Sequence, residues 1–171
     1  AGFENLIACD MGGTSFDVSL ILGGTPALSA EKDLAYGVPV HVPMVDIHTI
    51  GAGGGSIARV DAAGLLRVGP ESAGAEPGPV CYGRGGAKPT VTDANLMLGR
   101  VEPSGFAGVN QAHGTEVVAA ALGSAIGDPL ALDAVSAAAA VLAVAGNQLA
   151  SAIRLVSVEK GHDPRDFTLF A

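Results

Sequence analysis

The chain has 171 residues, of which 49% are hydrophobic and 15% charged, and its formal net charge is −8 at pH 7. This composition is too apolar for a disordered protein and too acidic for a general nucleic-acid surface, which requires clustered lysine and arginine. No uninterrupted apolar run reaches the ~18 residues that a membrane span requires, so we expect a single domain over residues 1–171 with neither a membrane nor a nucleic-acid partner.

The first part of the chain has the pattern of short strands. An apolar run at Leu6–Cys9 predicts a buried strand, and Phe16–Leu22 predicts a second strand after a glycine-rich turn at Met11–Ser15. Thr25–Val42 predicts one or two more strands, although Pro39 weakens the pattern. We therefore expect an antiparallel meander with tight turns.

A second group of strands follows. Val45–Ile50 is rich in β-branched residues, and a second glycine-rich loop comes directly after it at Gly51–Gly55. Ser56–Val60 and Leu65–Val68 flank the turn sequence Asp61–Gly64, which is typical of a hairpin. These segments extend the predicted sheet region to residue 68.

The remaining residues are predicted to be a long loop, helices and a final strand. Residues 69–90 are rich in proline and glycine, and loops of this length in compact domains are usually functional. Helices are predicted at Thr92–Leu98 and Thr115–Ala125, and the longest from Asp128 to Lys160, with Asp128 as N-cap and proline at the first helical position. With an apolar strand at 167–171, the order indicates an α/β protein with a mixed sheet covered by helices on one face.

The turn of the first hairpin carries the clearest chemical signal. Gly12 and Gly13 allow the backbone to adopt positive φ and allow a bulky anion to approach the chain. Successive N–H groups in such a turn bind anions, and Thr14 and Ser15 add hydroxyl donors. These four residues are predicted to hold the phosphates of a nucleotide; the alternative is an ordinary tight hairpin.

Two carboxylates flank this turn. Asp10 and Asp17 lie at the two stems of the hairpin, so we expect them to be neighbours, and a divalent cation would relieve their repulsion. Mg²⁺ is typically held by one or two carboxylates with phosphates and waters. Asp10 and Asp17 are therefore predicted to be catalytic and to bind Mg²⁺. The turn is neither a Walker A loop, which has a lysine after the glycines, nor a dinucleotide fingerprint, which leads into a helix.

Five further residues carry weaker signals. Gly53 and Gly54 are candidates for close approach to a substrate, or belong to a plain flexible turn. Arg84 is a candidate for clamping an anionic substrate group. Asp46 and His48 share one face of a predicted strand and are either metal ligands or a hydrogen-bonded structural pair.

The remaining polar candidates have structural interpretations. Asp93 and Asn95 most simply cap the helix that follows. Cys81 would act as a nucleophile only if a base lowered its pKa, and the sequence shows no such base. Cys9 and Cys81 do not form a disulfide framework, so we expect both to be reduced, as in the cytoplasm.

The string Asp10–Asp17 resembles the phosphate loops of the actin, sugar-kinase and heat-shock chaperone ATPase superfamily. The whole chain is similar to the A-type subunits of the hydantoinase/oxoprolinase family, apart from residues 107–127, which match no family motif. The further stretches that carry this resemblance are Asp46–Ser56, Gly69–Gly74, Pro77–Gly86, Thr90–Asn95 and Gly161–Phe167.

The resemblance implies an actin-like, ribonuclease H-like lobe of an enzyme that uses ATP and Mg²⁺ to open a lactam or imide ring. Some relatives carboxylate ketones instead, and a non-catalytic nucleotide-binding or subunit-docking module is a further alternative. It also implies that the chain is a fragment of a longer protein that starts at the second phosphate loop. The first lobe, the adenosine-side element and a hydantoinase B-type subunit or fused domain would complete the enzyme, so we expect the fragment to be inactive alone.

Overall fold

The computed structural model describes residues 2–29, 32–34, 38–40, 43–105 and 114–171. By their contacts these residues form two compact units. Unit 1 comprises Ala1–Asp10, Phe16–Ile50 and Ala150–Ala171, and unit 2 comprises Met11–Ser15 and Gly51–Leu149. The single domain expected over residues 1–171 stays a prediction, and each unit is described by itself.

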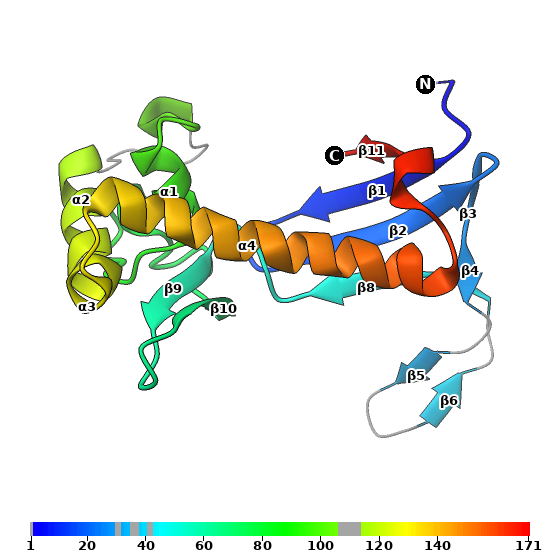
Figure 1. Cartoon of the computed structure of the whole chain (residues 1–171), viewed down its shortest axis with the longest axis horizontal. Helices are drawn as coiled ribbons and strands as arrows, with labels where there is room; N and C mark the ends of the chain where they lie inside the picture. Colours follow the sequence, from blue (N-terminus) through cyan, green and yellow to red (C-terminus); the bar gives the residue numbers. More distant parts are fainter. Residues whose placement is uncertain (1, 30–31, 35–37, 41–42, 106–113) are drawn as a thin grey trace. The chain divides into compact units, whose positions relative to one another are not determined.

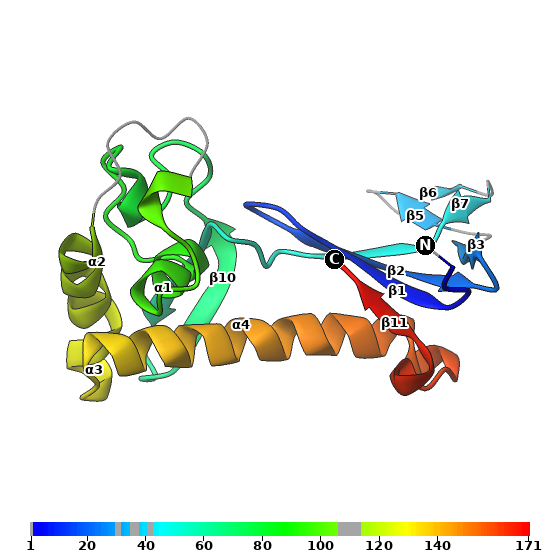
Figure 2. The same cartoon turned by 90° about the horizontal axis from the view of Figure 1, so that it is seen from above.

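A mixed sheet forms the body of unit 1 (Figure 1). Its strands are β1 (Leu6–Met11), β2 (Phe16–Leu22), β3 (Thr25–Pro26), β8 (Ile47–Ile50) and β11 (Thr168–Phe170). Their order is β11-β1-β2-β3, with β8 also pairing with β2. The pairs β2–β3 and β2–β8 are antiparallel, whereas β11 runs parallel to β1 (Figure 2). The predicted strand–turn–strand at residues 6–22 and the mixed sheet are confirmed.

The meander differs from the prediction in its third strand. β3 has two residues and pairs only with the end of β2, at Ile21 and Leu22. The rest of that edge of β2 is taken by β8, which pairs Asp17 with Thr49 and Val18 with His48.

Small two-stranded sheets replace the one or two strands expected over residues 25–42. β4 (Leu28–Ser29) pairs with β7 (Met44–Val45), and β5 (Lys32–Leu34) pairs with β6 (Val38–Val40). Residues 30–31, 35–37 and 41–42 of the predicted segment lie outside the described residues.

Strand alternation gives the unit 1 sheet two different faces. On one face Ile7, Val18 and Leu20 are buried. The last turns of helix α4 (Ala134–Val156), from residue 150 onward, add buried Ala152 and Val156 to the same unit. Asp17, between the buried positions Phe16 and Val18 of β2, therefore belongs to the opposite face.

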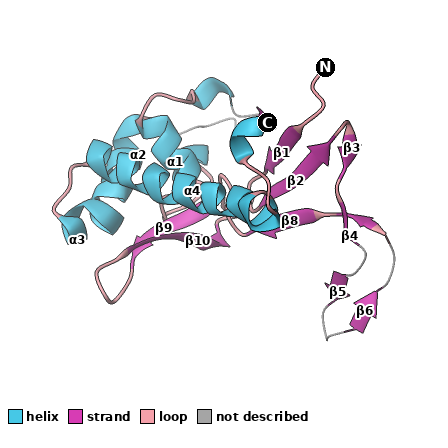
Figure 3. Ribbon diagram, turned by 45° about the vertical axis from the view of Figure 1, so that its right-hand side comes forward, coloured by secondary structure: helices cyan, strands magenta, loops and turns pink. Residues whose placement is uncertain are grey.

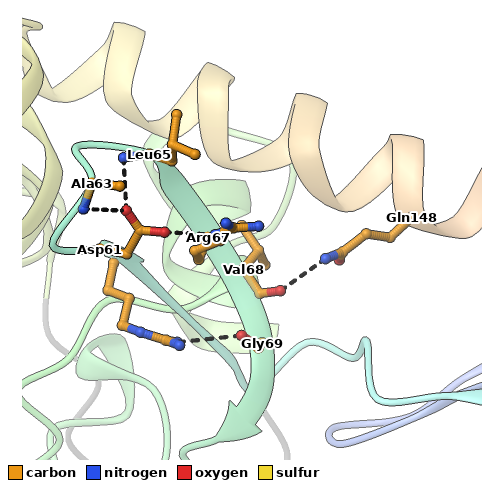
Figure 4. Close-up of polar contacts among 8 residues, drawn as sticks. Asp61, Ala63, Leu65, Arg67, Val68, Gly69 and Gln148 are labelled. Carbon is orange, nitrogen blue, oxygen red and sulfur yellow. Dashed lines mark hydrogen bonds and ion pairs between the residues drawn. The ribbon is translucent and has the colours of Figure 1, made fainter.

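Unit 2 contains the predicted hairpin, formed by β9 (Ser56–Val60) and β10 (Leu66–Ser72) (Figure 3). The Asp61 carboxylate shapes its turn by accepting the N–H groups of Ala63 and Leu65 at 2.9 and 3.0 Å (Figure 4). Arg67 donates to the same carboxylate at 2.8 Å, and this bond, with the backbone bonds, holds the pKa of Asp61 below its usual range. The hairpin turn predicted at residues 61–64 is confirmed.

The three shorter helices of unit 2 are α1 (Val91–Met97), α2 (Thr115–Leu122) and α3 (Asp128–Leu130). A π-helical stretch at Gly123–Gly127 continues α2 into α3. Buried apolar residues of α1, α2 and the hairpin form one core with α4. They include Ala58, Val68, Val91, Ala94, Leu96, Val118, Leu122, Ile126, Ala137, Ala138, Val141 and Ala145.

A buried carboxylate joins α1 to the long loop. Asp93 is fully buried and completes a capping box with Thr90, the N-cap of α1, so its predicted capping role is confirmed. Its two oxygens also accept the N–H groups of Val80 and Cys81, at 3.1 and 2.8 Å. The proline- and glycine-rich segment therefore has an ordered 3₁₀ turn at Val80–Tyr82. Asn95 instead donates to the Val91 carbonyl within the helix.

The longest helix starts later than the sequence predicted. Asp128 begins the short helix α3, and the chain then turns through Ala131, whose φ is 54°. Asp133 caps α4 instead, because its carboxylate accepts the Ser136 N–H at 2.6 Å. Helix α4 itself ends at Val156, before the predicted end at Lys160, and a separate 3₁₀ turn at Val158–Lys160 then stops at Gly161, which has a φ of 83°.

Helix α4 is more hydrophobic than the uninterrupted apolar runs suggest. Over Ala134–Lys160 it is long and apolar enough to cross a membrane, by length and composition alone. A mean over a window tolerates isolated polar residues, which explains why a count of continuous runs missed it. Mostly buried core helices of soluble proteins pass the same test, whereas 22% of the most apolar window of this helix is buried. Gln148 of this helix donates to the Val68 carbonyl of β10 at 2.9 Å, a contact made within unit 2 (Figure 4).

Candidate functional site

The two glycine-rich loops lie against each other in unit 2. The N–H of Gly54 donates to the carbonyl of Gly12 at 3.0 Å, and the N–H of Gly55 donates to the carbonyl of Gly13 at 2.6 Å. The first loop is closed by a bond from the Gly12 N–H to the Ser15 carbonyl at 3.0 Å. The second loop thus holds the backbone of the first in a fixed conformation.

Glycine at position 53 is required by this contact. A Cβ on Gly53 would lie 2.7 Å from the Gly12 oxygen and 2.7 Å from two backbone atoms of Gly13, closer than real Cβ atoms approach. A Cβ on Gly54 would lie 2.8 Å from the Thr92 hydroxyl. Packing thus accounts for both glycines, and the substrate role expected for Gly53 and Gly54 stays a prediction.

Packing within the protein does not require glycine at position 13. The expectation that Gly12 and Gly13 use positive φ is wrong, since neither adopts that conformation. A Cβ on Gly13 would meet no heavy atom within 4 Å, and one on Gly12 would make only an ordinary contact of 3.8 Å with the Ser15 oxygen. Both residues are exposed, so the outer side of the loop backbone is open to an approaching group.

Hydroxyl groups lie beside this loop. The Thr14 hydroxyl is 3.4 Å from that of Ser72, and Ser72 also accepts the Gly74 N–H at 3.1 Å. Ser72 lines a cavity of about 440 Å³ in unit 2 together with the ion pair Lys88–Glu71, which measures 2.9 Å. Sequence reasoning missed Ser72, because only folding brings residues 58 positions apart together.

The two predicted carboxylates line one cavity of unit 1. Its volume is about 550 Å³, and Asp10 is exposed there while Asp17 is half-buried. The Thr49 hydroxyl, directly opposite on β8, donates to Asp17 Oδ1. The other residues that line this cavity are Ala8, Cys9, Val18, Ser19, Ile47 and Phe170.

This donor set fits Mg²⁺ and does not form a complete protein cage. Among the residues that the structure describes, no group of three or more His, Cys, Asp or Glu side chains is arranged to hold a metal ion. Mg²⁺ keeps several waters and commonly uses one or two carboxylates together with substrate phosphates. Two accessible carboxylates on one cavity wall satisfy that requirement.

Two of the other predicted ligands, Asp46 and Arg84, have protein partners of their own. Asp46 forms an ion pair with Lys160, and His48 is half-buried opposite Val18 in the sheet. Their predicted metal role therefore has no third ligand within the described residues and stays a prediction. Arg84 donates to the Ala75 carbonyl at 3.2 Å and lies 5.8 Å from the centre of the Tyr82 ring. Its predicted substrate role also stays a prediction.

The two cysteines are thiols in different surroundings. Cys81 is fully buried, and burial followed by the charge of Asp93 raises the pKa of its thiol far above the usual range. This environment is the opposite of the one that activates a nucleophile. Burial also raises the pKa of Cys9, which is partly accessible.

The comparison with known proteins agrees with this architecture. The chain matches the hydantoinase/oxoprolinase family model over residues 1–171. It is 47% identical over 169 residues to the alpha subunit of the caprolactamase of Pseudomonas jessenii, covering 98% of this chain and 24% of that protein. It is 40% identical over 171 residues to the acetophenone carboxylase gamma subunit of Aromatoleum aromaticum, covering 99% of this chain and 23% of that protein.

A solved structure extends the likeness to the fold. The crystal structure of the ATP-dependent caprolactamase from Pseudomonas jessenii superposes with a TM-score of 0.89 at 46% identity, over 98% of this chain and 24% of that one. The chain thus spans about a quarter of the length of these relatives. Its mixed sheet and packed helices are the α/β fold of actin-like ATPase type that the sequence predicts, and the chain belongs to the hydantoinase/oxoprolinase family.

Proposed function

We propose that this chain is the phosphate-binding part of an ATP-dependent enzyme that opens cyclic amides. The observation that carries the proposal is the open side of the Gly12–Gly13 loop. The neighbouring loop fixes the backbone there, while a side chain on Gly13 would meet only empty space. A rigid backbone with room beside it suits an anion, because the donors need no reorganisation when the anion binds.

Each predicted residue has a distinct role in this proposal. The backbone of residues 12–15 and the Thr14 hydroxyl bind phosphate oxygens. The Asp10 and Asp17 carboxylates hold hydrated Mg²⁺ through their accessible oxygens. When bound, MgATP supplies the phosphoryl group that activates the amide oxygen of the ring toward water. The carboxylates keep the cation in place while charge shifts during this transfer.

The relatives support a lactam or imide as the substrate. The 47% identical relative is named a caprolactamase, and caprolactam is a cyclic amide. Ketone carboxylation is the second candidate, because the gamma subunit of acetophenone carboxylase is 40% identical over almost the same residues. A non-catalytic binding module is the third, but the presence of both Asp10 and Asp17 favours catalysis.

The same comparisons support partner chains. Both relatives are named as subunits, so we propose that a full-length protein containing this chain works with a hydantoinase B-type subunit or fused domain and with a further lobe that completes the nucleotide site. We place the enzyme in the cytoplasm, in keeping with two unpaired cysteines. The buried residues of α4 and the bond from Gln148 to Val68 support its packing within the protein rather than in a membrane.

The test is Asp10→Asn and Asp17→Asn in the full-length protein, with ATP turnover measured on lactams, hydantoins and ketones. We expect each variant to lose about a hundredfold in turnover, or roughly 2.7 kcal/mol, because one charge that holds the cation is lost. Melting temperature should be unchanged or slightly higher, since repulsion between the two carboxylates is relieved.

The matched control is Asp163→Asn. The Asp163 carboxylate also belongs to unit 1, but it is paired with Arg165 at 2.6 Å and does not line the cavity. This variant should leave turnover unchanged. If Asp10→Asn and Asp17→Asn melt much earlier while the folded enzyme keeps normal turnover, the two carboxylates only shape the hairpin and the proposal is wrong. Turnover with ketones and bicarbonate but not with lactams would favour the carboxylase.

A further inference from the structure

We infer that Thr49 is a positioning residue that fixes the Asp17 carboxylate for the cation. This inference rests on the proposed Mg²⁺ site at Asp10 and Asp17. Thr49 lies in the stretch Asp46–Ser56 that carries the family resemblance, but neither that resemblance nor the pattern of the sequence assigns it a role.

The geometry is set by the sheet. Asp17 and Thr49 are directly opposite each other on β2 and β8, so their side chains leave the sheet on the same face as close neighbours. The Thr49 hydroxyl donates to Asp17 Oδ1, and both residues line the cavity that contains Asp10. This bond occupies one oxygen of the carboxylate and leaves Oδ2 for another partner.

Exposure argues against a mainly structural purpose for the bond. Thr49 is exposed and Asp17 only half-buried, so water would satisfy both groups if the bond were absent. A hydrogen bond that replaces bonds to water adds little to the stability of the fold. Its effect is instead to restrict the rotation of the carboxylate, and such outer hydrogen bonds orient metal-binding carboxylates and typically change metal affinity about 10–100-fold.

Two variants test the effect of the Thr49 hydroxyl separately from the effect of the side chain's shape. Thr49→Val keeps the branched form that suits a strand and removes the donor, whereas Thr49→Ser keeps the donor and removes a methyl group. Thr168→Val is the matched control, because it makes the same change on exposed β11 of the same sheet and outside the cavity.

The experiment measures Mn²⁺ binding by electron paramagnetic resonance in the full-length protein, with ADP present. It also measures the Mg²⁺ concentration that gives half-maximal ATP turnover. We expect Thr49→Val to weaken Mn²⁺ binding and raise the Mg²⁺ requirement about tenfold, with turnover near normal at saturating Mg²⁺. The Mn²⁺ affinity and the Mg²⁺ requirement of Thr49→Ser should stay within about twofold of those of the unmodified protein. Those of Thr168→Val should equal the values of the unmodified protein.

The possible outcomes separate the two ideas. If the unmodified protein binds no Mn²⁺ with ADP and hydrolyses no ATP, the proposed function fails. If it does both and Thr49→Val has the same Mn²⁺ affinity, the proposed function stands and the positioning role of Thr49 is overturned. Should Thr49→Val not fold, Thr49→Ala removes the same hydroxyl, and an unchanged affinity in that variant overturns the inference equally.

Discussion

The two glycine-rich loops of unit 2 contain glycine for opposite reasons. At Gly53 a Cβ would lie 2.7 Å from three backbone atoms of the other loop, so the protein itself excludes any side chain. At Gly13 a Cβ would meet nothing within 4 Å, and no unusual φ is used. Glycine at position 53 therefore serves the fold, whereas neither packing nor backbone conformation requires glycine at position 13.

The largest effect is expected from Gly53→Ala. The added methyl group collides with backbone atoms, which do not move aside as a flexible side chain does, and overpacking of this kind typically costs about 1–3 kcal/mol or more. We expect the full-length protein to melt several degrees earlier and to lose ATP turnover as the Gly12–Ser15 loop is displaced. Thermal melting and turnover measured on the same preparation check this. An unchanged melting temperature would show that the two loops are not packed as described.

Gly13→Ala should reverse that pattern. The Cβ meets open space, so stability should stay within about 0.5 kcal/mol of the unmodified protein. The same Cβ occupies room that we assign to the phosphates, so ATP affinity should fall about tenfold, equivalent to about 1.4 kcal/mol. The test is to measure ATP affinity by calorimetry and stability by thermal melting on the same variant. Normal affinity with normal stability would remove the main argument for a phosphate loop here.

The smallest effect is expected from Thr92→Val, which probes the support of the second loop. The Thr92 hydroxyl donates to the Gly54 carbonyl at 2.8 Å, and that carbonyl also accepts the Thr92 N–H at 2.8 Å. Losing the first bond leaves the carbonyl with one partner, so we expect a cost of about 1 kcal/mol in a denaturant titration. ATP affinity should weaken less than in Gly13→Ala. A larger loss of affinity than in Gly13→Ala would mean that the second loop, rather than the first, binds the phosphates.

Local patterns predicted those parts of the fold that nearby residues determine. The strand–turn–strand at 6–22 and the turn at 61–64 follow from alternation and from Asp61 bonding its own neighbours. The predicted start of α4 was wrong because Asp128 and Asp133 both have cap chemistry, and only the turn through Ala131 selects between them. The side chain at Ala131 gives no sign of that turn, since alanine does not favour positive φ.

The candidate site could be predicted only on the hairpin itself. The contact of Gly54 with Gly12, and that of Thr49 with Asp17, join residues 42 and 32 positions apart, and such pairings depend on the register of the whole fold. Cys81 shows the converse. Its loop position left a reactive role open, yet burial, followed by the charge of Asp93 12 residues later, raises the pKa of its thiol.

Asp93 also limits how the long loop can move. One carboxylate accepts N–H groups from Val80, Cys81 and Thr90 and a hydroxyl bond from Thr90, so the loop and the first turn of α1 share a single anchor. Moving the loop away would remove the Val80 and Cys81 N–H partners of a buried carboxylate. The free-energy cost of leaving a buried charge short of partners is large. Any movement of the long loop that keeps these bonds must therefore carry Val80 and Cys81 together with the first turn of α1.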